Sequence, residues 1–426
     1  MLPVSATRSA DADTTLKTIR KTDCLELVNR TQHAETWSVV ITTTCAVTKP
    51  VIFIPGDGGS QLEAKLNKSS VVHYLCAKTS TDYFNIWLNM ELLVPVIIDC
   101  WIDNIKLTYD NVTRKTYNAP GVEIRVPGFG SSETVEWLDP SHASSGAYFK
   151  DIANTLVTLG YQRNLSIRGA PYDFRKAPNE NQEYFVKLKA LVEETYLMNA
   201  NQKIIFIAHS MGGPMSLLFL QKQTQAWKDK YIQCLVTLSG AWGGSAKAVK
   251  VFAIGDDLGS YALRGSVLRA EQITSPSLAW LLPSKLFWKD SEVLVQTEKK
   301  NYTISNMEEF FNDLQYPSGW EMRKDTEQYM LDFTAPGVEL HCLYGNNVNT
   351  VERLFYKPGT FLDGTPTLIY GDGDGTVNIR SLEACQYWAG RQKQQIFNKT
   401  LNKIDHMTIL RDKQTLDYIS DLINSL

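Results

Sequence analysis

The segment Ile207-Ala208-His209-Ser210-Met211-Gly212-Gly213 restricts the fold of this chain more than any other feature. The apolar run at 203–208 is typical of a buried parallel strand, and the residues after Gly212 have the apolar spacing of a helix. A serine in a sharp turn between strand and helix, with tiny neighbours on both sides, matches a nucleophile elbow. Ala208 stands where glycine is usual, which is a small change in volume. A serine that only caps the helix is the weaker interpretation, because a cap requires neither the strand nor the small neighbours.

Strands and helices alternate over most of the chain, which has 426 residues. Short apolar runs predict strands at 51–54, 165–169, 203–208, 234–239 and 367–371. This order predicts an α/β-hydrolase fold with a mostly parallel central sheet covered on both faces. We expect residues 1–48 to be a poorly ordered N-terminal extension and residues 49–426 to be the hydrolase domain. The alternation is lost at 243–340, which predicts a cap or lid inserted over the sheet.

The serine needs a base and an acid, and in this fold class the acid comes first and the histidine second along the chain. The glycine-rich run 371–375 follows a predicted strand, and its glycines allow the sharp turn that places an acid at the strand end. Asp374 is the predicted acid, and Asp372 competes for the role. His406 is the predicted base, because it follows this run and precedes the last helix. The run also resembles a calcium loop, but the closing glutamate of such a loop is missing, so we predict no metal.

The turn Gly56-Asp57-Gly58-Gly59 follows the first predicted strand. In this fold class one backbone donor of the oxyanion hole lies at this place, and the other follows the nucleophile. We expect the N–H groups of Asp57 and Met211 to bind the oxyanion; the alternative is a tight turn without that role. An ionised Asp57 carboxylate would repel the oxyanion, whereas a protonated one can donate a hydrogen bond. Asp57 is therefore expected to favour activity at acid pH.

Charge and composition exclude several classes of function. The formal net charge is −3, which gives no basic field for binding nucleic acid. No apolar run reaches the ~18 residues that span a membrane. Passage through the secretory route is favoured by 7 cysteines together with Asn-x-Ser/Thr acceptors at Asn29, Asn67, Asn111, Asn164, Asn301 and Asn398. Residues 1–50 lack the pattern of a signal peptide, so we interpret the N-terminus as a processed or truncated leader.

Several longer segments resemble the lecithin:cholesterol acyltransferase-like family, and within it the lysosomal (group XV) phospholipase A2 branch. The segments are Ile54-Pro55-Gly56-Asp57, 86–104, Arg125-Val126-Pro127-Gly128-Phe129-Gly130, 168–175, Ala208-His209-Ser210-Met211-Gly212 and 371–378. The resemblance runs from residue 50 to the C-terminus. Two positions depart from the family pattern: residues 239–244 lack the proline expected before Trp242, and Gly213 replaces a polar side chain. Both lie near the expected acyl site, so the acyl-chain preference is left open.

The resemblance implies roles for particular residues. The implied site residues are the triad Ser210, Asp374 and His406 and the oxyanion-hole residues Asp57 and Met211. A disulfide between Cys76 and Cys100 is implied in a membrane-binding insertion at 75–105. A second disulfide is implied between Cys342 and Cys385. The cysteines without an implied partner are Cys24, Cys45 and Cys234.

Aromatic and aliphatic side chains crowd the 75–105 insertion, and an enzyme that acts on lipid must touch a bilayer. The expected lipid-binding side chains are Trp87, Leu88, Leu92 and Leu93. Ordinary core packing is the alternative, and for about half of the apolar residues in this stretch it is the better one. In the lid, Lys247 and Arg269 are the candidates to meet the substrate phosphate.

The resemblance implies a serine-dependent phospholipid acyl hydrolase and O-acyltransferase. The acyl chain would move from a glycerophospholipid to Ser210, and then to water or a lipid alcohol such as ceramide, with no cofactor. The expected partners are a bilayer surface and these lipids, and we expect a monomer in the lysosome or secreted. The alternatives are a secreted sterol-esterifying acyltransferase or neutral lipase, and a catalytically inactive lipid-binding protein. The complete set of Ser210, Asp374 and His406 disfavours the inactive protein.

Overall fold

The computed structural model describes residues 17–21, 24–33, 36–45, 48–259 and 263–426. Its centre is a six-stranded sheet in the order β10-β4-β11-β12-β15-β18, in which every neighbouring pair is parallel. The strands are β4 (Val51–Ile54), β10 (Ile167–Gly169), β11 (Ile204–His209), β12 (Ile232–Leu238), β15 (Glu339–Asn346) and β18 (Ile396–Asn402). The parallel central sheet predicted for an α/β-hydrolase is confirmed.

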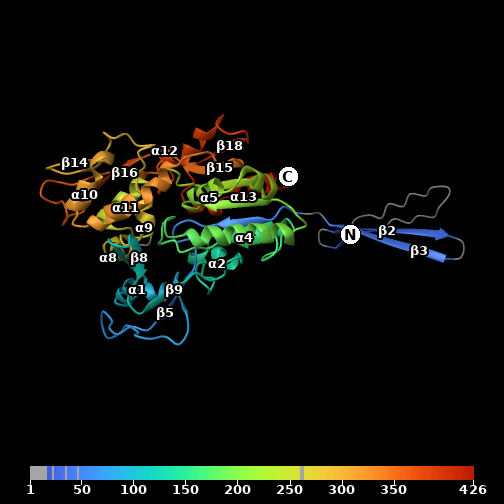
Figure 1. The fold of residues 1–426 in the computed structure, drawn as a ribbon, viewed down its shortest axis with the longest axis horizontal. Coiled ribbons are helices and arrows are strands. Elements are labelled where there is room, and N and C mark those ends of the chain that lie inside the picture. Colours follow the sequence, from blue (N-terminus) through green and yellow to red (C-terminus); the bar gives the residue numbers. More distant parts are fainter. Residues whose placement is uncertain (1–16, 22–23, 34–35, 46–47, 260–262) are drawn as a thin grey trace.

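Helices cover both faces of this sheet, because consecutive strand residues point to opposite sides. Ile52 and Phe206 contribute to one apolar cluster, and Phe53 and Ile207 contribute to the other. The first cluster includes α4 (Gln182–Met198) and α5 (Gly212–Gln221), and the second includes α3 (Lys150–Thr158) and α13 (Lys413–Ser425). Figure 1 shows α4, α5 and α13 alongside the central strands.

The carboxyl ends of β4 and β11 form a topological switch point. The chain runs from β4 to β10 at the sheet edge and returns through α4 to β11 on the other side of β4. Loops that leave neighbouring parallel strands in opposite directions separate, and ligands of open α/β sheets bind in the resulting crevice. The glycine-rich turn after β4 and the serine turn after β11 both lie at this edge of the sheet.

Much of the predicted insertion at 243–340 packs around a separate apolar cluster, whereas Leu268, Trp280 and Met330 join the main core. The elements of the insertion are α7 (Ala246–Ile254), α8 (Gly265–Gln272), α9 (Pro276–Trp280), β13 (Val293–Gln296), β14 (Asn301–Thr303), η3 (Ile304–Asn306), α10 (Met307–Asp313) and α11 (Pro317–Leu331). In Figure 1 they gather on one side of the molecule, away from α5 and α13. A second sheet in the order β14-β13-β16-β17 joins them to β16 (Thr350–Phe355) and β17 (Thr367–Gly371).

The placement of β17 corrects one expectation from the sequence. The strand at 367–371 was expected to continue the strand–helix alternation of the central sheet, but β17 pairs antiparallel with β16 in the second sheet. Apolar runs show where a strand forms but not which partner it pairs with. The second sheet therefore contains strands from both before and after β15.

The 75–105 insertion carries β6 (Phe84–Trp87), η1 (Met90–Leu93) and α1 (Ile97–Ile105). Strand β6 pairs with β5 (Leu62–Leu66), which also pairs with β9 (Val122–Arg125).

The expected disulfides Cys76–Cys100 and Cys342–Cys385 are both present. Cys234 is buried and is the free cysteine among the described residues. The remaining elements are α2 (Glu133–Glu136), α6 (Gln225–Tyr231), α12 (Ile379–Leu382), β7 (Leu107–Asp110), β8 (Lys115–Asn118), η2 (Ser144–Gly146), η4 (Glu383–Trp388) and η5 (Thr408–Leu410).

The N-terminal segment forms a three-stranded antiparallel sheet of β1 (Lys17–Lys21), β2 (Cys24–His33) and β3 (Thr36–Cys45). The register of β2 and β3 places the backbone of Cys24 opposite that of Cys45. A poorly ordered extension was expected over residues 1–48, and the described part differs because β3 is rich in β-branched residues, which favour strands. Residues 1–16 lie outside the described residues. Across the described chain, no helix combines the length and apolarity needed to cross a membrane.

Candidate active site

Ser210 lies between β11 and α5, in the turn that the sequence predicts. Its φ is +54°, a left-handed value that costs an L-residue roughly 1–2 kcal/mol. A Cβ atom on Gly212 would overlap the carbonyl oxygen of Ile54, and one on Gly56 would lie 2.6 Å from Cβ of Ser210. The turn after β4 thus touches the serine turn, and this contact requires glycine at both positions.

Ser210, His406 and Asp374 form one hydrogen-bonded chain. Nε2 of His406 lies 2.9 Å from Oγ of Ser210, and Nδ1 of His406 lies 2.7 Å from Oδ2 of Asp374. The three residues are buried, and Asp374 is completely so. The backbone N–H of His406 also donates to the carbonyl oxygen of Asp374 at 2.8 Å, which ties the two loops together. In this arrangement a histidine can accept the proton of a serine while the acid orients the imidazole.

The surroundings of Asp374 favour its ionised form. Oδ1 accepts hydrogen bonds from the backbone N–H groups of Thr376 at 3.0 Å and Val377 at 2.7 Å. Burial would by itself raise the pKa of Asp374, but the charge and hydrogen bond of His406 and these two donors outweigh burial and hold the pKa below its usual range. Asp372, the competing acid, is exposed and accepts at 2.6 Å from a backbone N–H in the loop between β15 and β16.

The N–H groups of Asp57 and Met211 are placed as candidate oxyanion donors. Within the described part of the chain, neither N–H donates to a protein acceptor. Met211 directly follows the serine and caps the N-terminus of α5, where the helix dipole is positive. The indole N–H of Trp87 donates to the carbonyl oxygen of Gly58 at 2.7 Å and so supports the turn that contains Asp57.

Two carboxyl groups near this turn have raised pKa values. Desolvation raises the pKa of Asp57 to about 7, against the opposing effect of the Gly58 N–H. Asp57 is nevertheless exposed, and contact with water favours the charged form of its carboxyl. Burial, followed by the charge of Asp57, raises the pKa of Glu271 on α8 to about 8. The sequence did not single out Glu271, because nothing local shows that this carboxyl faces inward.

The side chains expected to bind lipid are mostly turned inward. Leu93 is buried, whereas Trp87, Leu88 and Leu92 are half-buried and pack against the main core. The exposed apolar side chains of this region are Val72, Tyr74, Leu75, Met90, Val94 and Val96. Aromatic density in the sequence thus located the region, but packing decided which side chains face water.

Lys247 and Arg269 are both engaged by neighbouring groups of the cap. Nζ of Lys247 lies 3.1 Å from a carboxylate oxygen of Asp256, which also pairs with Lys250 at 2.6 Å. Nε of Arg269 donates to the carbonyl oxygen of Phe252 at 2.7 Å, and burial lowers the pKa of Arg269. Lys247 and Lys250 thus share the carboxylate of Asp256.

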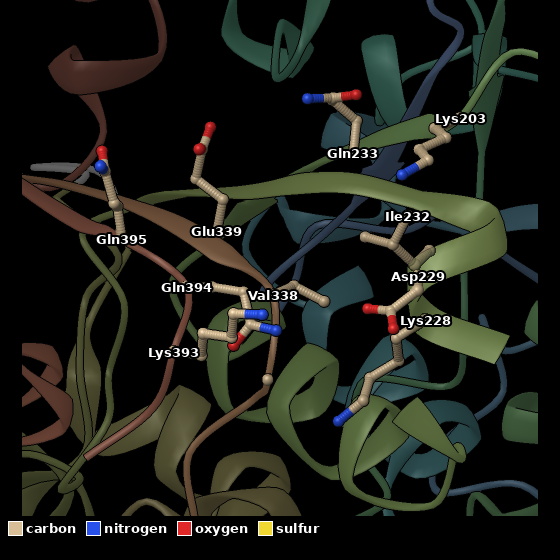
Figure 2. A pocket seen from close by; sticks show the side chains of 11 residues that line it. Lys203, Lys228, Asp229, Ile232, Gln233, Val338, Glu339, Lys393, Gln394 and Gln395 are labelled. Carbon is tan, nitrogen blue, oxygen red and sulfur yellow. The ribbon is translucent and has the colours of Figure 1, made fainter. Parts of the chain in front are cut away.

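A pocket of about 400 Å³ lies at the opposite edge of the sheet, where β12 and β15 begin. Figure 2 shows the side chains of Lys203, Lys228 and Lys393 around it, together with Asp229 and Glu339. Ligands of parallel α/β sheets bind at the carboxyl ends of the strands, and this pocket lies at the amino ends. We therefore place the candidate active site at Ser210 and not in this pocket.

Comparison with known proteins gives a consistent set of relatives. The family model described as "Lecithin:cholesterol acyltransferase" matches residues 83–413. The chain is 46% identical over 374 residues to "Lysosomal phospholipase A and acyltransferase" of Homo sapiens, covering 88% of this chain and 90% of that protein. It is 42% identical over 369 residues to "Phosphatidylcholine-sterol acyltransferase" of Gallus gallus, covering 87% and 89%.

Among solved structures, the crystal structure of the Tle4–Tli4 complex aligns with a TM-score of 0.51 at 14% identity. The alignment covers 88% of this chain and 98% of that chain. At this identity the match bears on the fold alone, and it agrees with the parallel sheet described above.

Proposed function

Because this chain belongs to the lecithin:cholesterol acyltransferase family, we propose that it is a serine-dependent phospholipid acyl hydrolase and O-acyltransferase. The observation that carries the proposal is the chain of hydrogen bonds from Oγ of Ser210 through His406 to Asp374. It supports Ser210 as nucleophile, His406 as base and Asp374 as the acid that orients it. A lipid-binding protein without catalysis does not require a buried serine with strained backbone that is hydrogen-bonded to a histidine.

The reaction proceeds in two steps. Oγ of Ser210 attacks the ester carbonyl of a glycerophospholipid while Nε2 of His406 takes the serine proton. The N–H groups of Asp57 and Met211 bind the resulting oxyanion, and the ester bond then breaks as His406 gives the proton to the departing lysophospholipid oxygen. In the second step His406 activates water or a lipid alcohol such as ceramide, which takes the acyl chain and releases the serine.

The relatives support the lysosome as the place of action and phospholipid as the acyl donor. The relative with 46% identity is named for lysosomal phospholipase A and acyltransferase activity, and the one with 42% is named for acyl transfer to sterol. We expect the chain to act as a monomer on a bilayer surface. The hydrolase domain is proposed to span 49–426, with the 75–105 insertion facing lipid and 243–340 forming the lid. Lys247 and Arg269 remain the lid residues proposed to meet the phosphate.

Products formed from phosphatidylcholine liposomes that contain ceramide or cholesterol test this function. We expect free fatty acid and acylceramide at a pH of about 4.5 and much less of both at about 7.5, where a lysosomal hydrolase is away from its working pH. Sterol ester formed only at neutral pH would move the chain to the sterol-esterifying branch. Absence of every product, with no labelling of Ser210 by a fluorophosphonate probe, would support the inactive lipid-binding protein.

Replacing Asp57 is expected to change the pH dependence of the reaction. Because desolvation raises the pKa of Asp57, its carboxyl gains a charge as the pH rises toward neutrality, and that charge opposes the oxyanion. In Asp57→Asn the side chain stays neutral, and we expect the ratio of kcat/KM at neutral pH to that at acid pH to increase about tenfold. The profile is measured with a soluble ester. Asp229→Asn, at the far edge of the sheet, is the control, and identical profiles for wild type and Asp57→Asn would contradict the proposed role.

Membrane contact is proposed for the exposed apolar side chains around the Cys76–Cys100 disulfide. Tyr74 is 91% exposed and Leu75 is 50% exposed, and burial of such side chains at a lipid interface is favourable. Leu75→Asp is expected to lower partitioning into phosphatidylcholine vesicles about 10- to 100-fold, because an apolar contact is replaced by a charge. Turnover of a soluble ester should not change. Val186→Asp, at an exposed position on α4, should leave partitioning unaltered, and equal losses in both variants would exclude a specific lipid-binding surface.

A further inference from the structure

A second chain of buried hydrogen bonds lies behind the triad and uses none of its side chains. The backbone N–H of Gly56 donates to the hydroxyl oxygen of Tyr148 at 3.1 Å. The Tyr148 hydroxyl is in short contact with Nδ1 of His209, the residue before the nucleophile. Nε2 of His209 lies 2.8 Å from the backbone carbonyl oxygen of His406. The chain therefore joins the three loops that carry the oxyanion turn, the nucleophile and the base.

The direction of each hydrogen bond follows from the chemistry of the groups. A carbonyl oxygen can only accept, so Nε2 of His209 carries a proton and donates to His406. In a neutral imidazole Nδ1 then has a lone pair and accepts from the hydroxyl of Tyr148. The hydroxyl oxygen in turn accepts from the N–H of Gly56. Every donor has an acceptor only when His209 is neutral.

Burial maintains this neutral state. Tyr148 and His209 are 3% and 1% exposed, and desolvation, followed by the charge of His406, lowers the pKa of His209 to about 3. The titratable groups that act on the pair are the His406 ring, the Asp374 carboxylate and the Asp57 carboxyl. A proton on Nδ1 would also turn an acceptor into a donor, and the phenol proton would then lack its acceptor among the described residues. The chain consequently keeps the same arrangement at acid and at neutral pH.

We propose that Tyr148 and His209 are positioning residues that hold the oxyanion turn at Gly56 and Asp57 in place against the nucleophile and the loop of His406. This inference rests on the proposed acyl transfer. Gly56 has no side chain with which to fix the turn, and a Cβ at this position would lie 3.2 Å from the Tyr148 hydroxyl and 2.9 Å from the carbonyl oxygen of His209. The hydroxyl thus lies at the point where the turn meets the elbow, whereas the indole of Trp87 and the hydroxyl of Tyr172 hold the turn through Gly58 and Pro55. Loss of that group should change the binding of the oxyanion and leave the binding of the substrate intact.

The test compares Tyr148→Phe with Tyr161→Phe. Tyr161 is a matched control: it is also buried in the second apolar cluster, and its hydroxyl donates to the carbonyl oxygen of Lys49 at 2.8 Å, beside the amino end of β4. We expect kcat on p-nitrophenyl butyrate to fall about 10- to 100-fold in Tyr148→Phe with KM within about twofold of wild type. Tyr161→Phe should keep kcat within about twofold while losing a similar amount of thermal stability.

A trifluoromethyl ketone of matching chain length supplies a second readout, because Ser210 adds to it and forms an oxyanion. The inhibition constant of this ketone in Tyr148→Phe should rise by the same factor by which kcat/KM falls. A general loss of stability does not produce such a match between the two factors. An unchanged inhibition constant, an effect on KM alone, or equal loss of kcat in the two tyrosine variants would overturn the inference. Ser210→Ala in the same assay tests the proposed function separately: loss of turnover in that variant together with unchanged kcat in Tyr148→Phe would leave the function standing and overturn the positioning role alone.

Discussion

Ser210→Ala is expected to lower kcat for acyl release by about 10⁶-fold and to leave the fold intact. The substitution removes only Oγ, which is 2.9 Å from Nε2 of His406. Without that oxygen no acyl-enzyme forms, and the residual rate comes from the oxyanion donors and substrate binding alone. Fatty acid release from phosphatidylcholine liposomes and single-turnover acylation by a soluble ester both measure the effect, and circular dichroism checks the fold.

Ser216→Ala is the matched control for this change. Ser216 lies within α5, is completely buried, and its hydroxyl donates to the carbonyl oxygen of Gly212 at 2.7 Å. This substitution also removes one buried hydroxyl, but that hydroxyl is already used within the helix, so kcat should stay within about twofold of wild type. Substantial acyl release by folded Ser210→Ala would rule out the serine as nucleophile.

Asp374→Asn should lower kcat by about 10⁴-fold. The amide keeps the size of the side chain and still accepts from the backbone N–H groups of Thr376 and Val377 through its oxygen. Its NH₂ group would then face Nδ1 of His406, and the imidazole would have to accept there and carry its proton on Nε2. In that tautomer the histidine cannot take the proton of Ser210. Pre-steady-state acylation by a soluble ester, recorded across the pH range, measures the loss.

Asp372→Asn distinguishes the two candidate acids. Asp372 is two residues away in the same glycine-rich run, is exposed, and uses Oδ1 to accept from backbone N–H groups, which an amide oxygen also does. Its kcat should stay within about twofold of wild type. A loss of about 10⁴-fold in Asp372→Asn, with Asp374→Asn active, would reverse the assignment.

The serine turn is the part of the site that the sequence reveals best, because its requirements are local. The strand, the turn and the helix around Ser210 are contiguous, and the left-handed serine with Ala208 and Gly212 beside it follows from sterics within a few residues. The alternation of strands and helices likewise predicts a parallel sheet, since apolar periodicity reports which face of each element is buried.

The sequence revealed less about which strands pair with each other and which apolar side chains are exposed to solvent. The strand at 367–371 is correctly placed along the chain, yet it joins the second sheet beside β16. Leu93 and Leu75 are equally apolar, but Leu93 is 5% exposed and Leu75 is 50% exposed. Both differences depend on distant segments that pack against these residues. The apolar periodicity within a window of a dozen residues carries no information about those distant segments.

The sequence by itself determined the fold class, the candidate nucleophile and, through the order of residues along the chain, the candidates for acid and base. Only the tertiary structure decided that Asp374 is buried against His406 while Asp372 faces solvent, and that Tyr148 reaches His209 across 61 positions of the chain. The physical reason is the range of the interactions involved. Steric strain and apolar spacing act between chain neighbours, whereas hydrogen bonds and desolvation depend on which distant loops the sheet brings to one edge.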